Sequence, residues 1–328
     1  MPKLVVPNSA ALHTANQFFR LNKPFRRNTK TAILQLHPRW LHVEPMGLVT
    51  IAAWRAWCRR KGYRITVRNQ GPHAAYMARM KLFEHLGVPY DARPVTAYEE
   101  AGRFLPVTQV TRRQDVPAVI AGISALLHLQ DDPESLSAVQ YCVSELLRNV
   151  LEHSGSPEGA FVAAHRYTKR GPHRVTIAVA DCGRGIADHL GRVHPEALTD
   201  DRVALALAMR PGITGAQAGP YGVPDNAGAG LFITRCMAKG TGGYFLLRSG
   251  AASYRLRRSR NDDEMIRLYM DAYEDPRHDE WLFRGSWQGT VVSVEIRTEK
   301  IGDYNGFFKW IFDQIPRRES RRGRIKFT

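Results

Sequence analysis

The feature that most constrains this chain is a strand that runs directly into an Asp and two alternating glycines. The apolar run Arg174–Ala180 predicts a buried strand, and Asp181-Cys-Gly-Arg-Gly-Ile186 follows it at once. An Asp at the end of a strand supplies one fixed hydrogen-bond acceptor, and the two glycines let the backbone approach a planar base closely. A plain turn between a strand and a helix is the alternative. The neighbouring segments distinguish a ligand-binding turn from a plain one.

A helix expected over residues 135–154 precedes this strand. Glu145, Asn149 and His153 recur every four residues in it, so they share one face of the helix. A carboxylate and a carboxamide one turn apart can serve a nucleophilic water and a Mg²⁺ ion respectively. A solvated polar face is the ordinary alternative for such a pattern. Alone, the helix indicates little.

A glycine-rich stretch, residues 211–231, follows the strand. It ends in Asn226-Ala-Gly-Ala-Gly-Leu231 and leads into an apolar helix over residues 231–238. Glycine at a helix entry lets backbone N–H groups and the helix dipole meet phosphate oxygens. A flexible surface loop is the alternative. Two further strands, 241–249 and 289–296, are predicted on either side of a charged insertion, residues 255–284.

Taken in this order, the segments resemble the GHKL superfamily of ATPases, and most closely its anti-sigma-factor-kinase and histidine-kinase branch. The helix is similar to the N box, and residues 181–186 and 228–231 are similar to the two glycine boxes. Gly289 and Thr290 are similar to the last box. The resemblance covers about 180 residues. It implies an α/β fold, a two-layer sandwich of the Bergerat type with a mixed sheet and helices on one face.

The resemblance also implies ATP and Mg²⁺ as ligands and gives each matched residue a role. Asp181 would accept from the adenine amino group, and Asn149 would hold a Mg²⁺ shared with the phosphates. Glu145 would polarise water for hydrolysis, as the catalytic residue. A lid would lie between residues 187 and 226. The expected nucleotide-binding set is Asp181, Gly183, Gly185, Ile186, Thr214, Gly228, Gly230, Leu231 and Thr290.

The first ninety residues predict a second, smaller α/β unit with a mainly parallel sheet. Strands over 31–36 and 63–67 alternate with helices over 47–60 and 74–86. The turn Val43-Glu-Pro-Met-Gly-Leu48 resembles the acidic-Ser-Ser-Gly-Leu turn of STAS domains, the fold of anti-sigma-factor antagonists. Pro45 and Met46 occupy the two serine positions, so the usual phosphoacceptor is missing. Any small α/β unit fits this span as well.

The expected division of the chain follows from these segments. It comprises an N-terminal extension (1–30), a STAS-like domain (31–90), a linker (91–110), an ATP-binding domain (111–316) with its insertion (255–284), and a basic tail (317–328).

Charge and cysteine usage narrow the class of protein. The net charge of +16 makes an anionic partner such as nucleic acid plausible, and the excess is interpreted as spread along the chain, with runs at Arg257–Arg260 and Arg317–Lys326. No helix-turn-helix, zinc-finger or RNA-binding signature accompanies it. The four cysteines are far apart and lack zinc spacing. The longest apolar run, residues 118–129, is too short for a bilayer, so we expect a cytoplasmic protein without a membrane partner.

The leading hypothesis is a bacterial Mg-ATP-binding regulator, a slow ATPase whose nucleotide-ordered lid controls partner binding. The resemblance implies a protein partner of the STAS or sigma/anti-sigma type, and a dimer stays open. Three alternatives remain: a serine/threonine protein kinase of the anti-sigma-factor type, a nucleic-acid-associated ATPase, and a nucleotide-sensing module that does not hydrolyse ATP. Histidine autophosphorylation is not expected, because residues 116–129 offer only one short helix before the ATPase segments.

Overall fold

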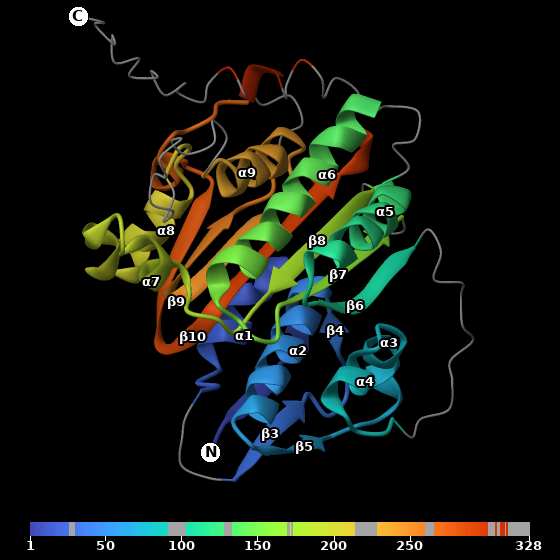
Figure 1. Cartoon of the computed structure of the whole chain (residues 1–328). Helices are drawn as coiled ribbons and strands as arrows, with labels where there is room; N and C mark the ends of the chain where they lie inside the picture. The colour runs from blue at the N-terminus through green and yellow to red at the C-terminus, as the bar shows by residue number, and fades with distance from the viewer. Residues whose placement is uncertain are drawn as a thin grey trace, which may run out of the picture.

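The computed structural model describes residues 1–25, 30–90, 103–127, 133–168, 171, 173–213, 228–259, 266–300, 306, 309–311 and 313. Thr214 and the end of the expected lid (215–226), residues 260–265 of the insertion and the basic tail lie outside this part of the chain. The fold is a mixed α/β structure with two principal sheets (Figure 1).

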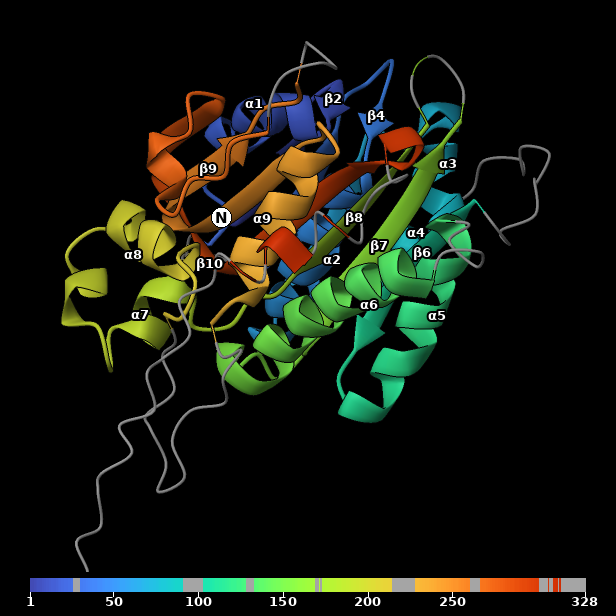
Figure 2. The same cartoon turned by 90° about the horizontal axis from the view of Figure 1, so that it is seen from above.

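The larger sheet has five strands in the order β6-β7-β8-β10-β9. These are β6 (Phe104–Val110), β7 (Ala160–Tyr167), β8 (Arg174–Ala180), β10 (His278–Arg297) and β9 (Phe245–Leu256). Helices α5 (Val116–Leu127), α6 (Pro133–Arg148) and α9 (Gly230–Gly240) cover one of its faces (Figures 1 and 2).

The expectation of a mixed sheet here is wrong, because all four described strand pairings are antiparallel. Two successive helices, α5 and α6, connect β6 to β7, and β7 returns antiparallel to β6. The strand predicted at residues 174–180 is confirmed with its bounds unchanged.

The smaller sheet is parallel, as the alternation of strands and helices predicts. Its order is β1-β3-β5, formed by β1 (Lys3–Val6), β3 (Thr31–Leu36) and β5 (Arg64–Arg68). A short parallel pair, β2 (Ser9–Ala10) with β4 (His42–Val43), lies beside it. The long helix α2 (Pro45–Arg60) starts two residues earlier than expected, because Pro45 occupies its first turn.

Residues 1–30 are not a bare extension. Leu4 and Val6 are buried in the core of the small unit, which makes β1 an edge strand of its sheet. Helices η1 (Leu12–Thr14) and α1 (Ala15–Arg20) follow, and Phe18 and Phe19 of α1 join the same core.

The two units share a core instead of standing apart on a linker. Helix α2 packs on β7 and β8, on the face of the large sheet opposite to α6 (Figure 1). Trp54 and Trp57 of α2 lie in one apolar cluster with Phe161 and Ala178 from those strands. The large sheet is therefore buried on both faces. We expect the two units to unfold together, because burial of this apolar contact stabilises both.

Two other expected boundaries are corrected. The helix predicted over residues 74–86 is broken into η2 (Pro72–Ala74), α3 (Ala75–Arg79) and α4 (Leu82–Leu86). Lys81 adopts a left-handed φ of 56° at the break. The carbonyl of Met80 there accepts a hydrogen bond from the N–H of Val107 in β6, at 3.0 Å. The end of the expected linker thus forms β6, docked on this break.

The expected insertion is partly a β-hairpin, since β9 and β10 pair through Leu256 and His278. The remaining short elements are η3 (Arg113–Asp115), α7 (Ile186–Leu190), η5 (Pro195–Leu198), α8 (Asp201–Ala208), η6 (Ala272–Glu274) and η7 (Thr298–Lys300). None of the described helices is long and apolar enough to cross a bilayer. All four cysteines are buried and free.

Candidate functional site

A cavity of about 270 Å³ lies where α6, α7 and α9 meet β8 and β10. Its walls are mainly apolar, with Val179, Leu190 and Val292 among them, and its polar groups come from distant parts of the chain. Nine of the eleven residues predicted for a nucleotide site line it. These are Glu145, Asn149, Asp181, Gly185, Ile186, Gly228, Gly230, Leu231 and Thr290. Apolar walls with a few convergent polar groups are typical of ligand sites.

Asp181 occupies the floor of the cavity and is only 1% exposed. Its Oδ1 accepts from the N–H of Gly183 at 2.7 Å, and its Oδ2 accepts from the N–H of Thr290 at 3.2 Å. Burial raises the pKa of Asp181 to about 7, although both backbone hydrogen bonds act to lower it. Each carboxylate oxygen has a second lone pair, so Asp181 retains the capacity to accept from a ligand.

Gly183 was predicted to contact the nucleotide, but it does not line the cavity. Its N–H fixes the Asp181 carboxylate instead. The turn is closed from the other side by Ser249, inside strand β9, which was not identified from the sequence. The Ser249 hydroxyl accepts from the N–H of Ile186 at 3.0 Å and donates to the carbonyl of Gly289 at 2.8 Å. The first and last boxes are thereby tied together.

The helix predicted over residues 135–154 changes its hydrogen-bonding pattern inside the site. It is α-helical to Arg148 and then forms a π-helical turn, η4 (Asn149–Ser154). Such turns are uncommon and occur frequently at functional sites. The widened turn keeps Glu145, Asn149 and His153 at the cavity, although their spacing is no longer that of a regular α-helix. Asn149 therefore lies where the carboxamide can reach a ligand.

Glu145 is 9% exposed and is held by an ion pair. Nη2 of Arg148 donates to Oε2 of Glu145 at 2.5 Å. The opposite side of Glu145 contacts the start of α9, where a Cβ on Gly230 would lie 2.8 Å from the Glu145 Cβ. The carboxylate is thus fixed between a guanidinium and a helix entry. Arg148 lines the same cavity and was not identified from the sequence.

The entry to α9 is built from the second glycine box. Gly228 has a φ of 82°, and a Cβ there would lie 2.1 Å from the carbonyl oxygen of Ile213. Only glycine fits this approach. Gly230 and Leu231 begin the 11-residue helix at the rim of the cavity, so the first-turn N–H groups are available to an anion. Thr214, the remaining predicted contact, lies outside the described residues.

Two stacked imidazoles form another part of the wall. The rings of His153 and His189 are 4.7 Å apart with an interplanar angle of 20°. Burial lowers the pKa of both, and the neighbouring His153 helps to bring that of His189 to about 4. Both rings are therefore neutral at pH 7. His189 was not predictable from the sequence, since it lies in a segment without clear periodicity.

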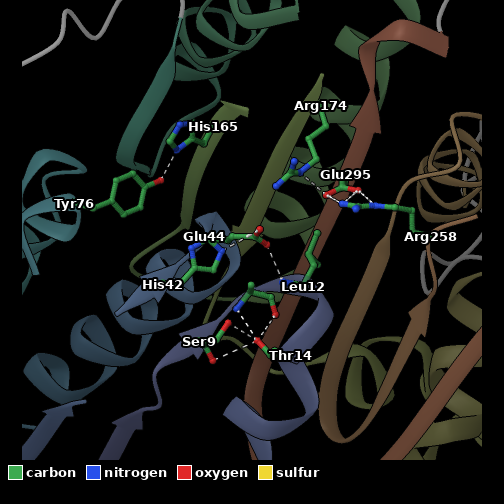
Figure 3. Close-up of polar contacts among 11 residues, drawn as sticks. Ser9, Leu12, Thr14, His42, Glu44, Tyr76, His165, Arg174, Arg258 and Glu295 are labelled. Carbon is green, nitrogen blue, oxygen red and sulfur yellow. Dashed lines mark hydrogen bonds and ion pairs between the residues drawn. The ribbon is translucent and has the colours of Figure 1, made fainter. Parts of the chain in front are cut away.

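The STAS-like turn is not part of this cavity. Glu44 is 3% exposed, and its Oε2 accepts from the N–H of Leu12 at 2.9 Å (Figure 3). Its Oε1 lies 3.6 Å from Nε2 of His42. Met46 and Thr50 are fully buried, and the Thr50 hydroxyl donates to the carbonyl of Met46 at 2.6 Å. Thr50 is therefore no substitute for the missing phosphoacceptor.

A second buried acid, Glu295, lies close to this turn, on β10 (Figure 3). It accepts from Arg258 at 2.7 Å and pairs with Arg174 at 3.0 Å. On the other side of the turn, the Tyr76 hydroxyl and Nδ1 of His165 are 2.6 Å apart. These contacts satisfy polar groups where the small unit meets the large sheet. The turn consequently has a structural role in the described fold.

No protein-family model matches the chain, and no curated protein matches it either. The cavity combines the deeply buried acceptor Asp181, the carboxylates of Glu145 and Glu152, the carboxamide of Asn149 and a glycine-flanked helix entry. This set suits a ligand with a hydrogen-bonding planar ring at one end and an anionic, metal-bound group at the other.

Proposed function

We propose that this protein is a Mg-ATP-binding regulator of the GHKL type, with a Bergerat-like ATPase unit and a STAS-like N-terminal unit. Asp181 accepts from the adenine amino group, and the entry of α9 at Gly228 and Gly230 binds phosphate. Asn149 holds the Mg²⁺ that the phosphates share. Glu145 polarises the water that attacks the γ-phosphate, and the protein is a slow ATPase.

One observation carries this proposal: residues between 145 and 290 that are far apart in the sequence converge on one cavity. The carboxylate of Asp181 lies at the end of the cavity formed by β8 and β10, beside Thr290. Glu145, Asn149 and Gly230 lie at the end formed by α6 and α9. Base recognition and phosphate recognition thus come from different elements, as expected for a ligand that spans the site.

A specific observation also favours a second candidate, a nucleotide-sensing module that binds ATP without hydrolysing it. The carboxylate of Glu145 is already paired with Arg148. A carboxylate that stays in this pair is a poor general base, because its Oε2 already accepts from the guanidinium and is not free to accept a proton from water. Hydrolysis therefore requires Arg148 to leave Glu145, and the γ-phosphate is an alternative partner for its guanidinium.

Calorimetric titration with ATP, CTP and GTP, each with Mg²⁺, tests the binding step. We expect ATP to bind more tightly than GTP, because a fixed acceptor at Asp181 matches the adenine amino group and not the guanine carbonyl. Equal affinity for ATP and GTP would remove the assignment of Asp181. Phosphate release from the same samples separates the two candidates. If the parent binds ATP without turnover and Arg148→Ala hydrolyses it, the protein is the sensing module, and Arg148 is the residue that prevents hydrolysis.

A further inference from the structure

The positive charge of this protein is concentrated in its first ninety residues. They contain 15 Lys and Arg residues but only two acidic ones, Glu44 and Glu84, and so carry +13 of the total of +16. The remaining 238 residues contain 32 basic and 29 acidic residues. The interpretation of an excess that is spread along the chain is therefore wrong. Because Glu44 is buried, Glu84 is the one exposed acid of this unit.

Part of this charge lies on a face of the parallel sheet that is open to solvent. The register pairs Thr31 with Arg64 and Gln35 with Arg68, so these side chains point to the same side. The opposite side holds Leu4, Leu34 and Val67, which pack in the core with α2. We call the outer side the basic face; it consists of Lys3, Thr31, Gln35, Arg64, Thr66 and Arg68, of which all but the half-buried Gln35 are exposed.

The basic face is unusual in two ways. Parallel sheets are normally covered on both faces, whereas this one presents a row of exposed polar side chains along its edge strand β5. Its cations are also unpaired. Within the described residues, Lys3, Lys30, Lys61, Arg64 and Arg68 make no ion pair, while Arg113, Arg202 and Arg255 of the larger unit each pair with a carboxylate.

We propose that the basic face, together with Lys30 and Lys61 at its rim, binds the phosphate backbone of a nucleic acid. Arg64 and Arg68 are four residues apart on one strand, which spans about 13 Å and lets the row follow several nucleotides. Unpaired Lys and Arg side chains supply the counterion-release term that dominates such binding. This inference does not depend on the proposed ATP site.

The chemistry of the face favours nucleic acid over other anionic partners. A protein interface needs an apolar centre, and a lipid surface needs an apolar element that inserts. On the basic face the apolar side chains are Val5, which is half-buried, and Ile33, which is 6% exposed. The described face also presents no helix to a groove, so we expect contacts to phosphates and little preference for base sequence.

The test measures fluorescence anisotropy of labelled duplex and single-stranded DNA of mixed sequence, titrated with the full chain at several KCl concentrations. We expect the logarithm of the affinity to fall linearly with the logarithm of the salt concentration, by about 0.9 per phosphate contact on duplex DNA. The double variant Arg64→Glu/Arg68→Glu should lose roughly tenfold or more in affinity, and its salt slope should become shallower by about 2.

The matched control is Arg284→Glu/Lys309→Glu, which makes the same change in net charge at exposed positions outside the basic face. We expect its DNA affinity to stay within about twofold of the parent. The milder Arg64→Gln/Arg68→Gln keeps the test valid if the Glu variant unfolds, which thermal unfolding of each sample reports. The proposal is overturned if the control loses as much affinity as the test variant. Tighter binding to phosphatidylserine vesicles or to polyglutamate than to DNA also overturns it.

Discussion

Each face of the large sheet carries an acidic side chain from a predicted motif, but the surroundings of the two acids differ. On the face covered by α6 and α9, an acid, an amide and several glycines surround a cavity, and Asp181 keeps accepting capacity there. On the face covered by α2, the acid of the STAS-like turn is Glu44. It accepts a hydrogen bond from Leu12 and is buried in packing. The polar groups of a motif stay accessible to a ligand where they border a cavity, and they become part of the packing where the fold covers them.

The largest effect that this comparison predicts concerns Glu145. Replacing it with alanine removes the carboxylate that we propose polarises water, and leaves the proposed base and phosphate contacts in place. We expect Mg-ATP to bind nearly as before, while phosphate release falls by roughly 10²–10⁴-fold. Helix α6 should persist, because alanine favours helices and Leu146 and Leu147 stay in the core. Parental turnover in Glu145→Ala would show that another group is the base.

The next effect in size is the pH dependence of stability caused by Asp181. An Asp in the unfolded chain loses its proton near pH 4, whereas burial raises the pKa of Asp181 to about 7 in the fold. The folded state therefore holds the proton longer, and stability falls as the pH rises from about 4 to 7. The size of this loss is on the order of 4 kcal/mol.

Comparing the parent with Asp181→Asn separates the titration of Asp181 from that of the other ionisable groups, which both proteins share. Urea unfolding of both proteins at pH 4.5 and at pH 8 gives the difference in their free energies of unfolding. We expect the parent to lose stability relative to the variant as the pH rises, since Asn does not titrate. A difference that stays constant across this range would contradict the raised pKa.

A smaller effect is expected at Asn149. Its carboxamide begins the π-helical turn, at the cavity. Asn149→Ala should weaken ATP binding by roughly tenfold or more in the presence of Mg²⁺, and much less with EDTA, because the ligand lost is one to the metal. Asn149→Asp serves as the matched variant that retains an oxygen ligand. An equal loss with and without Mg²⁺ would assign Asn149 to the nucleotide itself.

The smallest expected effect concerns the STAS-like turn on the face covered by α2. Incubation with Mg-ATP should place no phosphate between His42 and Thr50. Pro45 and Met46 lack hydroxyls, and Thr50 is buried, with its hydroxyl hydrogen-bonded to the carbonyl of Met46. Phosphopeptide mapping of the full chain measures this. A phosphate on Thr50 would mean that the turn opens, and the structural role assigned to it would be wrong.

The strands 31–36 and 174–180 were predictable because each is a compact apolar run bounded by polar residues. The strands β1 and β6 were not. β1 has four residues in a segment interpreted as polar and basic, and Pro106 interrupts the pattern of β6. The packing of α2 on the large sheet was not predicted either. Helix α2 is buried on nearly all sides over residues 45–58, which is typical of a helix packed between two layers.

The candidate site was predictable to a larger extent than the fold around it. Polar and glycine residues at strand ends and helix entries carry a local signal, so Asp181, Gly228 and Gly230 could be identified without the structure. Ser249, Arg148 and His189 could not, because each acts through a partner that only the folded chain brings near: Gly289, Glu145 and His153.

The measurement that tests the central claim most directly is calorimetric titration of Mg-ATP into the parent and into Asp181→Asn. The matched control is Asp188→Asn, the same chemical change at an exposed position that does not line the nucleotide cavity. At pH 8 we predict saturable binding to the parent and to Asp188→Asn, and a loss of roughly a hundredfold in Asp181→Asn, where a donor replaces half of the acceptor. Equal affinities for all three folded proteins would contradict the nucleotide site.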